Sequence, residues 1–130
     1  MTMETNDPAP AAVPVPRPEP PVEPRVSIDE FKKFKLAVGQ IKEAEVHPNA
    51  DKLFVLKVDI GTEVRQLVAG IRRSYAPEQL VGRRVVVITN LQPAIIRGVE
   101  SQGMVLAASD DQGVSVLQPD RDVALGSGVK

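Results

Sequence analysis

The segment 83-RRVVVITNLQPAIIRGVESQGMVLAA-108 decides how this chain folds, because it holds two short apolar runs on either side of a polar connection. Val85–Ile88 and Val105–Ala108 are short enough for buried strands, and their composition suits strands. The connection contains residues that end or bend strands, namely Asn90, Pro93, Arg97-Gly98 and 101-SQG-103. The segment therefore predicts a strand, a long structured connection and a second strand. Connections of this kind carry function when a rigid scaffold positions them.

Three more strands are predicted on the amino-terminal side of this segment. Leu36–His47 predicts one long strand with an irregularity near Gly39, because Ile41 breaks the alternation of apolar residues. Leu53–Ile60 predicts a clear strand, with Phe54, Leu56, Val58 and Ile60 on one face, and Val64–Ala69 returns after a short turn that contains glycine.

Short helices and a carboxyl-terminal hairpin complete the predicted elements. The pattern 27-SIDE-30 is a capping box, and Ile28, Phe31 and Phe34 give the helix that follows it one apolar edge. The stretch 76-APEQLVG-82 predicts a single helical turn with proline at its start and glycine past its end. A turn at 110-DDQG-113 leads into a last strand, and the residues after it are rich in turns.

These elements predict an all-β fold with short helices. A helix between the third and fourth strands is typical of the five-stranded oligonucleotide/oligosaccharide-binding barrel, or OB-fold. We therefore expect a five-stranded OB-fold barrel with an N-terminal helix and a C-terminal β extension. In that fold, ligands bind on the second and third strands and on the loops that join strands one to two and four to five. Those loops are residues 47–52 and 90–103 here.

Length and composition predict one domain with a tail. Eight of the 12 prolines lie within residues 1–27, which predicts a disordered Pro-rich tail or linker, and residues 28–130 form the domain. The chain has no cysteine, which excludes disulfides and thiol chemistry and favours a cytoplasmic location. No apolar run approaches the roughly 20 residues that span a bilayer, and the acidic, proline-rich start does not resemble a signal peptide.

Charge is unevenly distributed along the chain. Residues 64–97 carry six arginines against one glutamate, a net charge of +5, whereas residues 98–130 have a net charge of −3. Such a separation can build a positive surface on a nearly neutral protein, and phosphate is a natural ligand for it. A solvated surface of mixed charge is the alternative that composition leaves open.

Four motifs in this order resemble one known family: 47-HPNADKL-53, 70-GI-71 with 75-YAPEQL-80, 90-NLQP-93 and 98-GVESQGM-104. Together they resemble the tRNA-binding barrel module that follows many methionyl-tRNA synthetases. The module also occurs in free-standing structure-specific tRNA-binding proteins and in the endothelial-monocyte-activating-polypeptide group. The resemblance covers roughly residues 28–130, and the proline-rich start resembles the linker between a synthetase body and this module.

The resemblance implies a noncatalytic domain that binds folded tRNA without strong sequence preference. It places RNA contacts at Ser101 and Met104, and it implies a homodimer formed through about residues 114–130. A synthetase catalytic body is a further implied partner. Members often carry a basic residue where this chain has Ala37, so a first-strand contact is missing unless Lys35 replaces it.

Chemistry adds further candidates for RNA binding. Arginine suits phosphate because its charged guanidinium presents a planar fork of donors. On this ground the candidates are Arg97 in the long connection, Arg72 and Arg73 after a strand, Lys52 after the first turn, and Asn90. A salt bridge is the alternative for Arg97 and Lys52, and a turn is the alternative for Asn90 and Ser101. We expect the arginines and the 97–104 connection to share one flank of the barrel.

Other functions have less support in the sequence. A single histidine, His47, stands before a proline in a turn, so we expect it to be structural or solvated and expect no metal site or cofactor. The chain has three phenylalanines and one tyrosine, too few for a base-stacking platform, which favours a folded RNA read by shape and backbone. A chaperone-like or protein-interaction dimer built on the same barrel is the alternative, and a pure dimerisation domain is a third.

Overall fold

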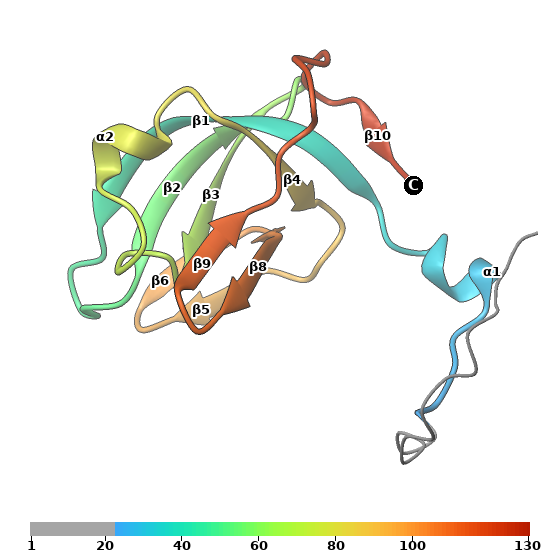
Figure 1. Cartoon of the computed structure of the whole chain (residues 1–130), viewed down its shortest axis with the longest axis horizontal. Helices are drawn as coiled ribbons and strands as arrows, with labels where there is room; N and C mark the ends of the chain where they lie inside the picture. The colour runs from blue at the N-terminus through green and yellow to red at the C-terminus, as the bar shows by residue number, and fades with distance from the viewer. Residues whose placement is uncertain (1–22) are drawn as a thin grey trace, which may run out of the picture.

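A computed structural model describes residues 23–130, and the greater part of the predicted tail, residues 1–22, lies outside the described residues. The described chain forms two short helices and ten strands around a nearly closed five-stranded antiparallel barrel, which confirms the predicted fold class (Figure 1). The elements are α1 Ile28–Phe31, β1 Leu36–Val46, β2 Phe54–Asp59, β3 Val64–Ala69, α2 Pro77–Leu80, β4 Arg84–Ile88, β5 Ala94–Ile96, β6 Val99–Ser101, β7 Met104–Val105, β8 Ala107–Asp110, β9 Gly113–Val116 and β10 Gly128–Val129.

The long strand β1 organises the barrel. It pairs with β2 over its second half and with β4 over its first half, and the strand order is β3-β2-β1-β4-β7. In β2 and β4, buried residues are concentrated on one face, as expected for strands that line a core. In β3, the adjacent residues Leu67 and Val68 are both buried, so both faces of its second half are covered. The least exposed apolar side chains are Ile41, Phe54, Leu56, Val58, Leu67, Leu80, Val85 and Val87.

The barrel closes between β3 and the segment Ser101–Gly103, which we call the closure seam. Here side chains replace part of the strand pairing: the Val68 N–H donates to Ser101 Oγ at 3.0 Å, and the Gln66 N–H donates to Gln102 Oε1 at 3.0 Å. The Gln102 N–H returns a bond to the Gln66 carbonyl at 2.8 Å. The edge of β3 is therefore satisfied without a regular strand beside it.

Gly103 is required by the seam. Its φ is +152°, and a Cβ built on it would lie 2.7 Å from the Ile88 carbonyl oxygen and 3.1 Å from Leu67 Cδ2. A backbone oxygen cannot move aside as a flexible side chain can. The seam therefore excludes every side chain at this position.

One local expectation is wrong, and two others become more specific in the structure. The register of β1 against β2 shifts between Ile41 and Glu43 rather than near Gly39. Gly39 instead allows close packing, since a Cβ there would lie 2.6 Å from Val58 Cγ1. The connection predicted to be structured contains a hairpin of its own, β5–β6, which was not predicted. The turn-rich end returns as β10 beside the start of β1, as part of the predicted C-terminal β extension.

Within residues 23–130, neither helix is long and apolar enough to cross a membrane.

Candidate nucleic-acid interface

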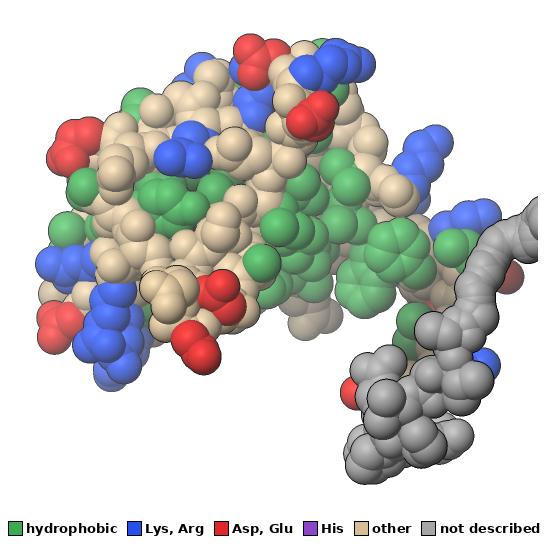
Figure 2. Space-filling model, viewed as in Figure 1, with side chains coloured by type: hydrophobic (Ala, Val, Ile, Leu, Met, Phe, Trp, Pro, Cys, Tyr) green, Lys and Arg blue, Asp and Glu red, His purple; other side chains and the backbone are tan. Residues whose placement is uncertain are grey.

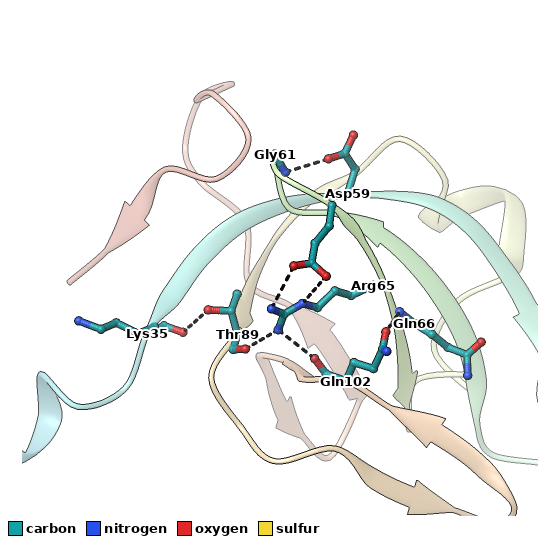
Figure 3. A network of polar contacts seen from close by, with 8 residues as sticks. Lys35, Asp59, Gly61, Arg65, Gln66, Thr89 and Gln102 are labelled. Atoms are coloured by element: carbon teal, nitrogen blue, oxygen red, sulfur yellow. Dashed lines mark hydrogen bonds and ion pairs between the residues drawn. The ribbon is translucent and has the colours of Figure 1, made fainter.

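Three of the six arginines in residues 64–97 are engaged within the fold, and Arg65 is the most connected of them (Figure 3). Its guanidinium donates to the carbonyl oxygens of Thr89 and, at 3.3 Å, Gln102, and it forms an ion pair with Glu63 at 3.4 Å. These bonds tie the end of β4 to the closure seam. The Arg65 guanidinium therefore has its donors engaged by other parts of the barrel.

Arg83 and Arg84 are also engaged. The Arg83 guanidinium carbon lies 5.2 Å from the centre of the Tyr75 ring, and its nitrogens donate to the Gln79 carbonyl at 2.6 Å and to Gln118 Oε1 at 2.8 Å. Arg84 pairs with Asp122 at 3.2 Å. Both arginines fasten the carboxyl-terminal segment to the barrel.

The other three arginines lie at one end of the barrel. Among residues 23–130, the side chains of Arg72, Arg73 and Arg97 form no hydrogen bond or ion pair, and neither does Lys52. The Arg72 N–H donates to the Lys52 carbonyl at 3.4 Å, which places the loop after β3 beside the β1–β2 turn. We call these four residues the basic loop end. Figure 2 shows basic side chains gathered where Figure 1 places these loops and the β5–β6 hairpin, at the lower left.

Two hydrogen bonds join the β1–β2 turn to the tip of the β5–β6 hairpin. His47 Nε2 lies 3.0 Å from the Ile96 carbonyl oxygen, and Asn49 Nδ2 donates to the Arg97 carbonyl at 3.0 Å. Arg97 is thereby held on the same end of the barrel as Lys52 and Arg72. The structure brings together four of the eight predicted site residues.

Lys35 and Asn90 lie elsewhere, at the opposite end of β1. Asn90 Oδ1 accepts from the Lys35 N–H at 2.8 Å, and Asn90 Nδ2 donates to the Lys33 carbonyl at 2.6 Å. Both polar ends of the Asn90 side chain are thus used to attach the α1–β1 connection to the end of β4. The Lys35 ammonium group points away from the network in Figure 3. These two predicted site residues therefore lie away from Arg72, Arg73, Arg97 and Lys52.

Ser101 and Met104 belong to one motif but have different environments. Ser101 is 3% exposed, and its hydroxyl accepts from the Val68 N–H and donates to the Gly103 carbonyl at 3.0 Å. This geometry favours the structural alternative for Ser101. Met104 pairs with Ile88 in the barrel, yet its side chain is 50% exposed and is open to a ligand.

Hydrogen bonds that join distant segments were not predicted, although His47 was expected to be structural or solvated. His47 is 2% exposed, and Asn49 and Gln102 bond to segments far away along the chain. The sequence did contain one indication of the β5–β6 hairpin. Gly98 follows Arg97 between two apolar stretches, and glycine is common at the second position of a two-residue hairpin turn. No group of three His, Cys, Asp or Glu side chains placed to hold a metal occurs in the described part of the chain.

A nearly closed small barrel, with basic side chains on its loops that have no partner among the described residues, is typical of nucleic-acid-binding barrel domains. Residues 36–128 match the model of the tRNA_bind family, described as "Putative tRNA binding domain". The chain belongs to this tRNA-binding domain family.

Individual relatives agree with that assignment. The methionine–tRNA ligase of Thermococcus kodakarensis is 57% identical over 105 residues, which are 81% of this chain and 14% of the ligase. The crystal structure of a MetRS related protein from Pyrococcus horikoshii superposes with a TM-score of 0.77 at 38% identity, covering 83% of this chain and 100% of that one. The chaperone CsaA of Bacillus anthracis superposes with a TM-score of 0.75 at 27% identity, covering 82% and 100%.

Proposed function

We propose that this chain is a noncatalytic module that binds folded tRNA by its shape and its phosphates, with the basic loop end as the main contact. The observation that carries the proposal is that Lys52, Arg72, Arg73 and Arg97 lie on adjoining loops and have no side-chain partner among residues 23–130, while Arg65, Arg83 and Arg84 are all engaged. Unpaired guanidinium and ammonium groups retain their donors for phosphate oxygens.

The aromatic residues support a folded RNA as the ligand. Phe54 is buried, Tyr75 accepts from the Val116 N–H at 3.1 Å, and Phe31 and Phe34 belong to α1 and the residues after it, at the other end of β1. The basic loop end therefore lacks a stacking platform of the kind that holds unstructured strands. Recognition through backbone and shape suits a folded RNA.

A larger protein is the proposed setting of the domain. The chain spans 14% of the length of the ligase it matches, so the ligase activity belongs to that whole protein. We propose that this domain serves as an appended tRNA-binding part of such a synthetase, or as its free-standing equivalent, and raises the affinity for tRNA. A cytoplasmic location stays a prediction.

Salt and RNA structure provide the test. Three to five phosphate contacts predict a fall in affinity of about 20- to 500-fold between about 50 and 200 mM salt. In a gel-shift titration, intact tRNA should bind more tightly than an unfolded RNA of equal length. Equal affinity for both RNAs, or an affinity independent of salt, would contradict the proposal.

We also propose that two copies associate through an apolar groove at the other end of the molecule, to which α1 contributes as well as the end of the predicted interface region 114–130. The groove lies between α1 and β10 and is lined by Ile28, Phe31, Phe34, Leu36 and Val129. Ile28 is 66% exposed and Phe34 is 49% exposed, and Figure 2 shows a broad apolar surface between the barrel and α1. An exposed apolar patch of this kind is typical of an interface.

Sedimentation equilibrium tests the homodimer. Phe34→Glu should convert a dimer to a monomer, whereas Val81→Glu, at an exposed apolar residue outside the groove, should not. A monomeric unmodified chain would contradict this part of the proposal.

A chaperone-like protein-interaction role is the second candidate, favoured by the same groove and by the likeness to the chaperone CsaA. The groove and the basic loop end lie at opposite ends of β1. If a peptide occupies the groove, folded tRNA should therefore not displace it. Displacement would place both ligands on one face.

A further inference from the structure

His47 is the single histidine of the chain and lies buried just after β1. The Asn49 N–H donates to its Nδ1 at 2.9 Å, so Nδ1 accepts. The ring proton is therefore on Nε2, which donates to the Ile96 carbonyl at 3.0 Å. Both nitrogens of the neutral imidazole therefore form hydrogen bonds. Nδ1 stabilises the β1–β2 turn, and Nε2 binds the β5–β6 hairpin.

The hairpin tip that His47 holds has an unusual conformation. Ile96 pairs with Val99, so Arg97 and Gly98 form a two-residue turn, with φ values of +53° and +89°. Asparagine and glycine are the residues that such a turn favours at its first position. Arg97 is the one residue other than glycine with a positive φ among residues 23–130. An observed departure of this kind supports a functional role for its side chain.

The hairpin needs this attachment. Its strands have three residues each and form a separate two-stranded sheet, which is weak by itself. At the tip, the β1–β2 turn holds two successive carbonyls: His47 binds that of Ile96, and Asn49 binds that of Arg97. The same turn ends at Lys52, whose carbonyl accepts from the Arg72 N–H.

We propose that His47 is a positioning residue for RNA binding. Its Nε2–H fixes the hairpin tip so that Arg97 stands beside Lys52 and Arg72 as one preformed group for the phosphates of a folded RNA. The inference rests on the proposed function. Preformed donors bind more tightly than mobile ones because less ordering is required when the ligand arrives.

Two substitutions separate the two bonds of His47. In His47→Asn, the amide oxygen can still accept from the Asn49 N–H, but the side chain is too short to reach the Ile96 carbonyl. In His47→Gln, the terminal amide can donate to Ile96 as Nε2 does. We expect His47→Asn to lower the affinity for intact tRNA by about fivefold and His47→Gln to restore most of that loss. Equal affinities of both variants with the unmodified chain would overturn the proposal.

A double-mutant cycle with Arg97 distinguishes positioning from general stability. Arg97→Ala should weaken tRNA binding by about tenfold, and His47→Asn should then have no further effect, because the side chain it positions is gone. Additive losses would show that His47 does not act through Arg97. Asn49→Ala, at an exposed residue, is a second variant for the same cycle if His47→Asn does not fold.

The cycle also separates this inference from the proposed function. If Arg97→Ala binds intact tRNA as tightly as the unmodified chain, the proposed contact itself is wrong. If Arg97→Ala weakens binding while the His47 and Asn49 variants leave it unchanged, the basic loop end is supported as the RNA contact, and only the positioning role of His47 is contradicted.

Discussion

The closure seam and the basic loop end both carry polar and basic residues, yet they use them in opposite ways. In the seam, Ser101, Gln102 and Arg65 satisfy backbone groups of β3 and β4. At the basic loop end, hydrogen bonds to backbone carbonyls hold the loops, while the charged ends of Lys52, Arg72, Arg73 and Arg97 have no partner in the described chain. Residues of similar chemistry thus stabilise the barrel in one region and are available to a ligand in the other.

The seam should be the more sensitive region for stability, and Gly103→Ala should have the largest effect. Its new Cβ meets the Ile88 carbonyl oxygen at 2.7 Å, so the free energy of unfolding should fall by more than about 3 kcal/mol. Urea unfolding followed by circular dichroism measures this. A loss below about 1 kcal/mol would mean that the seam is looser than described.

The basic loop end should be the more sensitive region for binding. Replacing Lys52, Arg72 and Arg97 together by alanine should lower the affinity for tRNA by about 100-fold, at roughly one phosphate contact each. The free energy of unfolding should change by less than about 0.5 kcal/mol, because these side chains bond to nothing in the described protein. A matched triple change at Arg25, Lys33 and Arg121, which are exposed and lie outside the groove, removes the same charge elsewhere and should weaken binding far less.

Ser101→Ala tests which region this residue belongs to. It leaves the buried Val68 N–H without an acceptor, so the free energy of unfolding should fall by about 1–3 kcal/mol. The folded variant should bind tRNA as the unmodified chain does. If the variant is as stable as the unmodified chain but binds tRNA more weakly, Ser101 is an RNA contact, as its motif predicts.

Arg97→Asn should affect stability and binding in opposite directions. Asparagine suits the positive φ of this turn better than arginine, so the free energy of unfolding should rise by up to about 1 kcal/mol. Affinity for tRNA should fall about tenfold as a phosphate contact is lost. Thermal melting and a binding titration on the same sample measure both, and a loss of both together would assign Arg97 to the scaffold.

Much of the barrel could be predicted from the sequence, because alternation and turn residues are local signals. The strands that correspond to β1–β4 and the capping box of α1 follow from such signals, and the Ser27–Glu30 bonds at 3.0 and 3.1 Å confirm the latter. The β5–β6 hairpin was not predicted because its turn begins with Arg97, and arginine is uncommon at a positive φ. The register shift in β1 was placed wrongly because it depends on the pairing with β2 rather than on Gly39.

The site was harder to predict because a residue's chemistry does not reveal whether the fold already occupies it. Arg65 and Arg97 look alike in the sequence, but carbonyls 24 and 37 residues away occupy Arg65. Ser101 bonds to a backbone group 33 residues away, and Asn90 to one 55 residues away. Such distant partners appear only when the chain is folded.

Amide chemical-shift mapping by NMR with intact tRNA compares the two regions most directly. We predict that the largest shifts and line broadening fall on residues 47–52, 70–73 and 96–98. Residues 33–35 and 63–66 should change little. Changes concentrated at residues 33–35 or along the closure seam, with the basic loop end unaffected, would contradict the assignment of tRNA binding to the unpartnered basic side chains.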